Sequence, residues 1–382
     1  MSTSAITASA SSVDGLAAQV RQAHDERRPV RIIGSGTWKA CGPVDAMTTI
    51  NTHTLDEILD YVPGDLTMTV GAGVTLSAIE RATAPHGQWL TLDPYGSPDG
   101  TIGATIASAS AGPLATAFGT PRDIVLGIEA VTGTGSVIRA GGRVVKNVAG
   151  FDLSRLFTGS RGTLGAITEV SLRLRGRPAV DETIAIAIAP KPAAIRDVAT
   201  ALRGWPATPM AAELLDAGAA SMLGLHSAAT LLIRFGGNAR SVAAQRKRAV
   251  ALGKSVVVES GIWERVRALD LDAAASCRIA DAPTAFIERW NDAAALCADG
   301  GQAIGSVLRG QIRCMLPAID RPAFNSFRSR VKTATVVFDS LPTAAMWNAL
   351  TTIPEEASLH ARVKDAFDPA GIMNPGAMRL AR

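Results

Sequence analysis

Three glycine-rich loops in the first half of the chain most constrain what it can fold into. They lie at residues 34–36, 100–103 and 159–165, and the first directly follows a short apolar run that ends at Ile33. A strand that leads into glycines brings backbone N–H groups close to a phosphate, because no side chain blocks the approach. A turn explains one such loop, whereas three together indicate a phosphate-rich ligand such as a dinucleotide.

The two most common nucleotide-binding motifs are absent from the sequence. GxGxxG does not follow the first predicted strand, and no acidic residue stands at the spacing that a Rossmann site needs. GxxxxGK[ST], the phosphate-binding loop of many nucleotide hydrolases, is also missing. The loops therefore predict a dinucleotide site on a different fold.

The hydrophobic pattern predicts mixed helices and strands along the chain. Ser12 is a candidate N-cap for the first helix. Strands are expected at 29–33, 67–70, 167–175, 183–189, 230–235, 255–258, 303–316 and 333–338, and a hairpin over 123–139. Helices are expected at 13–25, 74–86, 101–112, 152–157, 192–204, 240–252, 283–298 and 355–366. Strands with helices between them after residue 178 favour a ferredoxin-like layer, in which two halves form a weak repeat.

Composition and charge favour a folded chain of two or three domains. The chain has 382 residues, of which 47% are hydrophobic and 19% charged. The net charge is only +4, and the densest basic run, 246–248, is interpreted as a solvated helix face. No basic stripe interleaved with aromatic residues is present, so nucleic-acid binding is not expected.

The cysteines and the absence of targeting segments predict a reduced, cytoplasmic protein. Cys41, Cys277, Cys297 and Cys314 form neither a CxxC pair nor a metal-ligand spacing, so no metal site and no four-cysteine iron–sulfur cluster is expected. The N-terminus lacks the pattern of a signal peptide, and no apolar run is long enough to span a membrane. Any membrane association would go through partner subunits.

Five segments resemble, in their order and their residues, segments of the vanillyl-alcohol-oxidase flavoproteins, which carry an FAD-binding domain of the p-cresol methylhydroxylase (PCMH) type. They are PVRIIGSGT, TIGATIASASAG, RDIVLGIEAVTGTG, VVKNVAGFDLSRLFTGSRGTLGAITEV and FDPAGIMNPG, and they cover about 29–176 and 355–382. GSGTW, SPDGTIGATIAS and KNVAGFDLSRLF are most similar to the FAD-binding subunits of bacterial glycolate oxidases. Those complexes pair two flavoprotein subunits with an iron–sulfur subunit and oxidise glycolate to glyoxylate.

The resemblance implies an α+β fold with three segments. Residues 1–177 would form a two-subdomain PCMH-type FAD-binding domain, 178–345 a ferredoxin-like α+β cap, and 346–382 a C-terminal segment that returns to the first domain. The implied contacts with FAD are Gly34, Ser35, Gly36, Thr37 and Trp38 at the pyrophosphate; Thr101, Ile102 and Gly103 along the pyrophosphate and ribityl chain; Ser108 near the flavin; Gly159, Gly162, Thr163, Leu164, Gly165 and Ile167 at the adenosine end; and Asn374 towards the isoalloxazine.

The chain also departs from the family pattern. No histidine stands between Gly34 and Trp38, which implies that FAD is held non-covalently. Ala109 replaces an asparagine of the family, and the cap has one histidine, His226, where related dehydrogenases use several to hold a metal and the substrate. Lys146 and His360 are weak catalytic candidates. Lys146 is either a cation beside the flavin or a solvated lysine, and His360 either faces the flavin or has a structural role.

The resemblance therefore implies an FAD-dependent oxidoreductase that acts on a small 2-hydroxy acid and is active as part of a complex. The expected partners are a sister FAD subunit and an iron–sulfur subunit. This chain would oxidise glycolate or relay electrons from it. The alternative is a structural partner that keeps the fold and binds FAD weakly or not at all, which the missing polar contact at Ala109 favours.

Overall fold

The computed structural model describes most of the chain, but some candidate residues lie outside the described part. Cys41, Lys146 and His226 are among those outside, so the predictions on them have no structural counterpart. The described residues are 7–9, 11–38, 48–142, 152–189, 191–225, 228–319, 321–331, 334–350 and 357–378.

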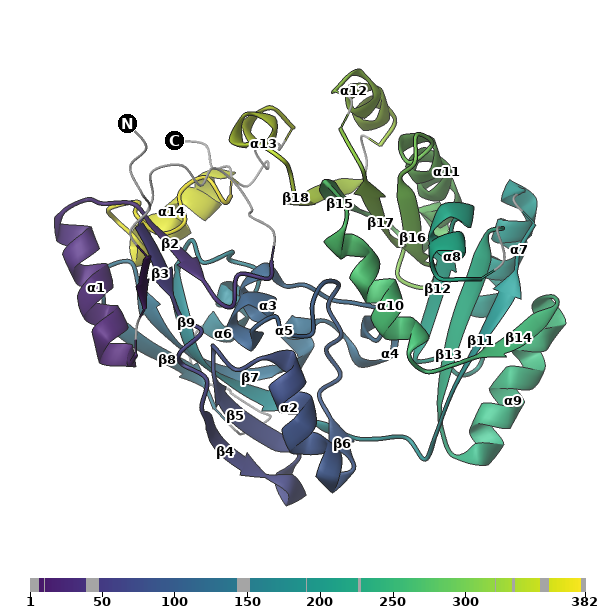
Figure 1. Ribbon diagram of the computed structural model, residues 1–382, viewed down its shortest axis with the longest axis horizontal. Helices are drawn as coiled ribbons and strands as arrows, with labels where there is room; N and C mark the ends of the chain where they lie inside the picture. The colour runs from purple at the N-terminus through teal and green to yellow at the C-terminus, as the bar shows by residue number, and fades with distance from the viewer. Residues whose placement is uncertain are drawn as a thin grey trace.

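The first helix, α1, packs on a small parallel sheet (Figure 1). α1 (Val13–Asp25) starts as predicted at Ser12, whose hydroxyl accepts a hydrogen bond from the Gly15 N–H at 3.1 Å. Leu16 and Val20 on its buried face pack against Val30 and Ile50 of the sheet. The sheet has the order β1–β3–β2, with β1 at Thr7–Ser9, β2 at Val30–Ile33 and β3 at Thr48–Asn51.

A five-stranded antiparallel sheet forms the second part of the N-terminal half. Its order is β4–β5–β9–β7–β8, and the predicted hairpin is confirmed as the pair β7 and β8. The strands are β4 (Ile58–Val62), β5 (Thr67–Gly71), β7 (Val125–Thr132), β8 (Val137–Gly141) and β9 (Gly165–Arg173). Helices α2 (Leu76–Thr83), α3 (Ile102–Ser108) and α6 (Leu153–Phe157) bury Ile79, Ile106 and Phe157 against it.

An eight-stranded antiparallel sheet makes up the cap, defined here as residues 180–340. Its order is β14–β11–β13–β12–β16–β17–β15–β18. The strands are β11 (Val180–Ala187), β12 (Ala211–Leu215), β13 (Thr230–Gly237), β14 (Ser255–Val258), β15 (Ala275–Ala280), β16 (Gln302–Ser306), β17 (Gln311–Leu316) and β18 (Thr335–Ser340). Each half has strand order 4-1-3-2, so the predicted ferredoxin-like repeat is confirmed, with β12 paired to β16 at the junction.

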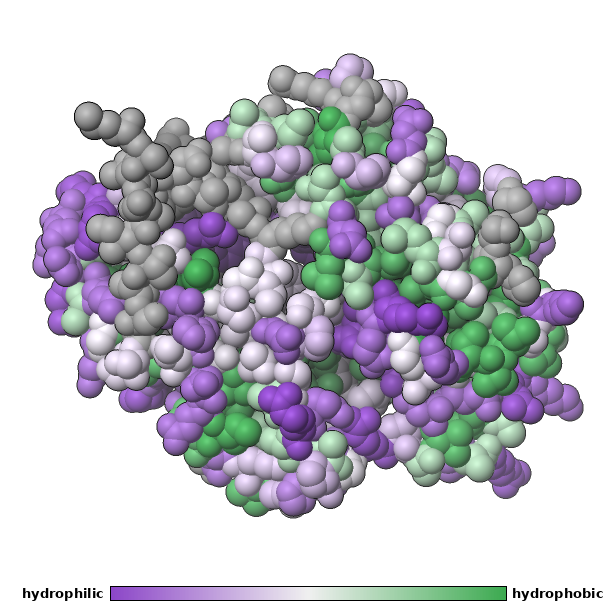
Figure 2. Space-filling view, viewed as in Figure 1, coloured by the Kyte–Doolittle hydropathy of each residue, from purple (hydrophilic) through white to green (hydrophobic). Residues whose placement is uncertain are grey.

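The two faces of the cap sheet are covered differently. One face packs on α7 (Pro192–Arg203), α9 (Ala239–Ala249), α11 (Phe286–Leu296) and α12 (Arg321–Arg330). The other carries α8 (Ala217–Met222) and α10 (Ile262–Ala268) and is turned towards the N-terminal half, whose Tyr95 joins its apolar cluster. Figure 2 shows apolar side chains gathered over β14 at the outer edge, where Val256 and Val257 are exposed.

The C-terminal segment returns to the N-terminal half. In Figure 1, α14 (Ala357–Phe367) lies close to β2 and β3, far in sequence from both, while α13 (Ala344–Leu350) lies between the two halves. The Val30 N–H donates to the Ile372 carbonyl at 2.9 Å, and Val30 forms a parallel bridge with Met373. Ile372 and Met373 therefore extend the edge of the first sheet.

The remaining elements are short connections. They are η1 (Pro63–Asp65), η2 (Ala84–His86), β6 (Gln88–Trp89), α4 (Ala115–Phe118), α5 (Pro121–Ile124), β10 (Arg175–Gly176), η3 (Val250–Leu252), η4 (Leu269–Leu271) and η5 (Pro283–Ala285). Among the described residues, no helix combines the length and the apolar character needed to cross a bilayer. The same residues contain no cluster of three side chains suited to a metal ion.

Candidate functional site

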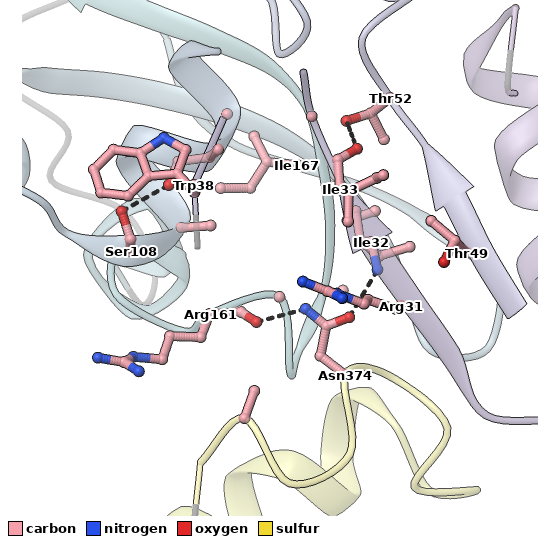
Figure 3. A pocket seen from close by; sticks show the side chains of 18 of the residues that line it. Arg31, Ile32, Ile33, Trp38, Thr49, Thr52, Ser108, Arg161, Ile167 and Asn374 are labelled. Carbon is pink, nitrogen blue, oxygen red and sulfur yellow. Dashed lines mark hydrogen bonds between the residues drawn. The ribbon is translucent and has the colours of Figure 1, made fainter. Parts of the chain in front are cut away.

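A groove of about 330 Å³ runs between the first sheet, α3, the loop after α6 and the C-terminal segment (Figure 3). This volume lies at the lower end of the range for small-molecule sites, about 300–1,000 Å³. Its lining residues are Arg31, Ile32, Ile33, Gly34, Gly36, Trp38, Thr49, Thr52, Gly103, Ala104, Ala107, Ser108, Arg161, Gly162, Gly165, Ala166, Ile167, Asn374 and Ala377. None of these described residues is acidic, so the groove suits an anionic ligand.

The turn after β2 packs closely against the start of α3. A side chain on Gly34 would overlap the side chain of Thr101, the N-cap of α3, so only glycine allows this approach. Gly36 has a φ of +74° with open space around its Cα. Within the described residues, the backbone N–H groups of 34–37 make no hydrogen bond with the protein. They are thus available to an anionic ligand.

Asn374 ties three distant segments together at the floor of the groove (Figure 3). Its amide oxygen accepts from the Ile32 N–H at 2.8 Å, and its amide nitrogen donates to the Arg161 carbonyl at 2.7 Å. Gly162 packs against it, since a Cβ there would lie 2.5 Å from its Nδ2. Asn374 therefore shapes the groove by joining β2 to the third glycine-rich loop.

A buried ion pair also holds the C-terminal segment in place. Lys364 Nζ contacts the Asp368 carboxylate at 2.7 Å and also donates to the carbonyls of Thr163 and Met373 at 2.9 and 3.1 Å. Asp368, fully buried, accepts from the N–H groups of Ile372 and Met373. A charge pair whose remaining hydrogen bonds are all made is the form in which buried ions are tolerated.

The structure brings nine of the sixteen predicted FAD contacts together along the groove. They are Gly34, Gly36, Trp38, Gly103, Ser108, Gly162, Gly165, Ile167 and Asn374. Ser108 also donates its hydroxyl hydrogen to the Ala104 carbonyl at 2.8 Å, which holds its oxygen at the wall.

The other seven predicted contacts do not line the groove. They are Ser35, Thr37, Thr101, Ile102, Gly159, Thr163 and Leu164. Ser35 donates to the Asp99 carbonyl at 2.8 Å, and the Thr163 hydroxyl donates to the Ser160 carbonyl at 2.6 Å. The N–H of Ile102 is bonded to Val74, so it is not free for a ligand.

Several lining residues were not predicted. Arg31, Ile32 and Ile33 belong to the strand before the first glycine loop, and their position there was the available signal. Arg161 lies inside the third loop, and Ala104 and Ala107 lie on the small-residue helix. Thr49, Thr52, Ala166 and Ala377 reach the groove through strand pairing and the chain return, which local sequence does not reveal.

Of the two weak catalytic candidates, only His360 lies in the described part of the chain. Lys146 lies outside the described residues. His360 is on α14, is half-buried and does not line the groove, and its Nδ1 has no hydrogen-bond partner within the described part of the chain.

Comparisons with known proteins agree with this geometry. The "FAD binding domain" family model matches residues 4–141, and the "FAD linked oxidases, C-terminal domain" model matches residues 343–378. The glycolate oxidase subunit GlcE of Escherichia coli is 40% identical over 162 residues, which are 42% of this chain and 46% of that protein. GlcD of Bacillus subtilis is 37% identical over 163 residues, 42% of this chain and 34% of that protein.

A dehydrogenase and a solved structure are also similar to this chain. A D-lactate dehydrogenase of Archaeoglobus fulgidus is 34% identical over 168 residues, 43% of this chain and 37% of that protein. The matches thus span less than half the length of these curated relatives. The structure of p-cresol methylhydroxylase aligns with 97% of this chain and 88% of its own at a TM-score of 0.78 and 16% identity, which shows the shared fold.

FAD fits the groove on structural grounds as well. The glycine turn leaves backbone donors without a partner among the described residues, and a side chain at Gly34 would clash with Thr101. The lining described here carries no negative charge to oppose a pyrophosphate. The chain therefore carries an FAD-binding domain of the FAD-linked oxidase type on the p-cresol methylhydroxylase fold, and glycolate oxidase subunits are among its relatives.

Proposed function

We propose that this chain is the FAD-binding subunit of a complex that oxidises glycolate or a similar small 2-hydroxy acid. The observation that carries the proposal is the groove, in which the β2 turn, α3, the third glycine loop and Asn374 converge. Relatives named as glycolate oxidase subunits and D-lactate dehydrogenase support the substrate class. A sister flavoprotein and an iron–sulfur subunit are the proposed partners.

In this proposal the sixteen predicted residues hold FAD non-covalently, nine of them along the groove and seven beside it. The three proposed segments are 1–177, 178–345 and 346–382, of which the first and last form the FAD site. FAD held by these residues would supply both two-electron and one-electron redox chemistry. The chain's own part is to bind and orient the cofactor and to shield it beneath the cap.

An absorbance spectrum of the purified chain, taken without air before and after glycolate is added, tests the proposal. Flavin bands that bleach with glycolate would support oxidation by this subunit. Bands that bleach only with dithionite would support electron relay and leave the oxidation to the sister chain. Absence of flavin bands after incubation with FAD would refute the cofactor assignment.

The second candidate is a structural partner that keeps the fold with little FAD. Ala109 favours it, because this residue takes a φ of +49° at the end of α3, where an asparagine would be less strained and would add a polar group. The same spectrum separates the two candidates, since only the first predicts a flavin content near one per chain.

A further inference from the structure

A row of polar side chains lies on the cap-sheet face that is turned towards the N-terminal half. Along β17, Ile312 and Cys314 enter the helix-covered core, whereas Gln311 and Arg313 point to the opposite face. Glu213 on β12 pairs in register with Ser306 on β16, which pairs in turn with Gln311. Polar residues thus cross three adjacent strands on a face that the N-terminal half covers.

Glu213 is the least satisfied member of this row. Its side chain is 2% exposed, and its Oε1 has no hydrogen-bond partner among the described residues. The side chain also bonds to Ser306. A buried carboxyl oxygen with no partner is costly, so it points to a ligand or water that completes it.

Arg309 lines the same pocket and is available to an anion. It lies in the turn between β16 and β17 and is half-buried, and within the described residues it forms no ion pair. Its guanidinium donates a long hydrogen bond of 3.5 Å to the Gly112 carbonyl. By contrast, the neighbouring Arg278 and Arg313 are both paired with Asp339.

The pocket lies between the two halves of the molecule and is lined by residues of both. Tyr95, Ala111 and Gly112 close it from the N-terminal side. The helix α3 that lines the groove ends shortly before Ala111. A further small cavity shares Trp38 with the groove and Tyr95 with the pocket.

From these contacts, and resting on the proposed function, we propose that the pocket binds the smallest 2-hydroxy acids, with Arg309 pairing to the carboxylate and Glu213 hydrogen-bonding the 2-hydroxyl group. Guanidinium groups bind carboxylates with two parallel hydrogen bonds. The free space is about 10 Å³, which is room for about one water, so an acid enters by displacing the half-buried side chain of Gln311 while the guanidinium of Arg309 turns towards its carboxylate. This favours two-carbon acids over longer ones.

The protonation of Glu213 adds a pH dependence to this site. Burial raises its pKa from 4.5 to about 8, although Arg309 and Ser306 act in the opposite direction, and Asp93 raises it further. Tyr95 and Arg313 also face this cluster. Glu213 is therefore neutral at pH 7 and does not repel an incoming carboxylate, whereas above about pH 8 it is charged and does.

Calorimetric titration of the full-length chain with oxamate, a two-carbon acid that the flavin cannot oxidise, tests the site directly. We expect R309M to weaken oxamate binding about tenfold or more and R309K to retain part of it. R240M is the matched control, because Arg240 is an exposed arginine on α9 of the cap. Binding to the wild type should weaken from pH 7 to pH 9, and E213Q should remove that dependence.

Three results would overturn the assignment: no oxamate binding by the wild type, equal binding by R309M, or the same pH dependence in E213Q. Thermal melts identify variants that fail to fold, in which case R309K and E213Q carry the test. If R309M and the wild type have the same KM for glycolate when its oxidation is followed by flavin bleaching, the proposed function stands and the substrate binds elsewhere. If oxamate binding depends on Arg309 but glycolate does not bleach the wild-type flavin, the binding site stands and oxidation by this subunit is refuted.

Discussion

At the scale of single residues, buried charges define how the C-terminal segment is held. Asp368 is fully buried and is the counter-ion of Lys364, whose other two contacts are uncharged carbonyls. D368N would leave a buried ammonium unpaired, so we expect it to lower the free energy of unfolding by about 3–5 kcal/mol. Urea unfolding measures this, with D365N, at an exposed position on the same helix, as the control. Equal stabilities of the two variants would contradict the role of the pair.

Glu213 gives a second prediction at this scale, independent of any ligand. Because burial raises its pKa from 4.5 to about 8, the folded state binds this proton more tightly than the unfolded state does. Its contribution to stability is complete below about pH 4.5 and is lost as the pH rises through 8. The stability of the wild type relative to E213Q should fall over this range, by an amount on the order of 3–5 kcal/mol. Urea unfolding at pH 5, 7 and 9 measures the difference, and a constant difference would show that Glu213 does not titrate there.

At the scale of elements, the contact between the β2 turn and α3 decides the shape of the groove. G34A would force a Cβ into the side chain of Thr101, so the turn and the helix must separate. We expect a stability loss of about 1–3 kcal/mol and a strong loss of bound flavin. G176A is the matched control, because Gly176 has open space around its Cα and no positive φ. Flavin absorbance per purified chain is the readout, and a normal flavin content in G34A would place the cofactor elsewhere.

At the scale of the whole molecule, the N-terminal half depends on residues from the far end of the chain. The side chain of Asn374 forms hydrogen bonds with the backbone of Ile32 and Arg161, and N374A would remove both. We expect a loss of about 2 kcal/mol in the free energy of unfolding, together with a lower affinity for FAD. N291A, at an exposed site on α11, should change neither. Fluorescence titration with FAD and urea unfolding measure the two effects, and tight FAD binding by N374A would show that the floor of the groove is dispensable.

The two halves also meet across polar contacts, and these decide where the cap sits. Arg161 of the third glycine loop donates to the Phe338 carbonyl at 2.9 Å and lies 3.6 Å from the Asp339 carboxylate. Arg278 and Arg313 hold the same carboxylate, which lowers the pKa of Asp339 and keeps it charged. The ring of Tyr95 lies under Arg313 at 4.4 Å. Polar residues that alternate along a strand are typical of a solvent-exposed face. In the cap sheet, however, this polar face is buried against the N-terminal half.

The sequence by itself determined the local elements and the positions of the glycine loops. Helix α1 and its Ser12 cap follow from helical periodicity and a side-chain oxygen, and the β7–β8 hairpin from alternation around a glycine turn, because both depend on neighbours in sequence. Tertiary structure alone decided which loops share a groove. Thr49, Thr52 and Ala377 reach it through pairing of β2 with β3 and with the C-terminal segment, contacts between residues far apart in the chain. It also buried Glu213 and left Arg309 half-buried between the two halves, since packing of one half on the other, and not the pattern along a strand, sets their exposure.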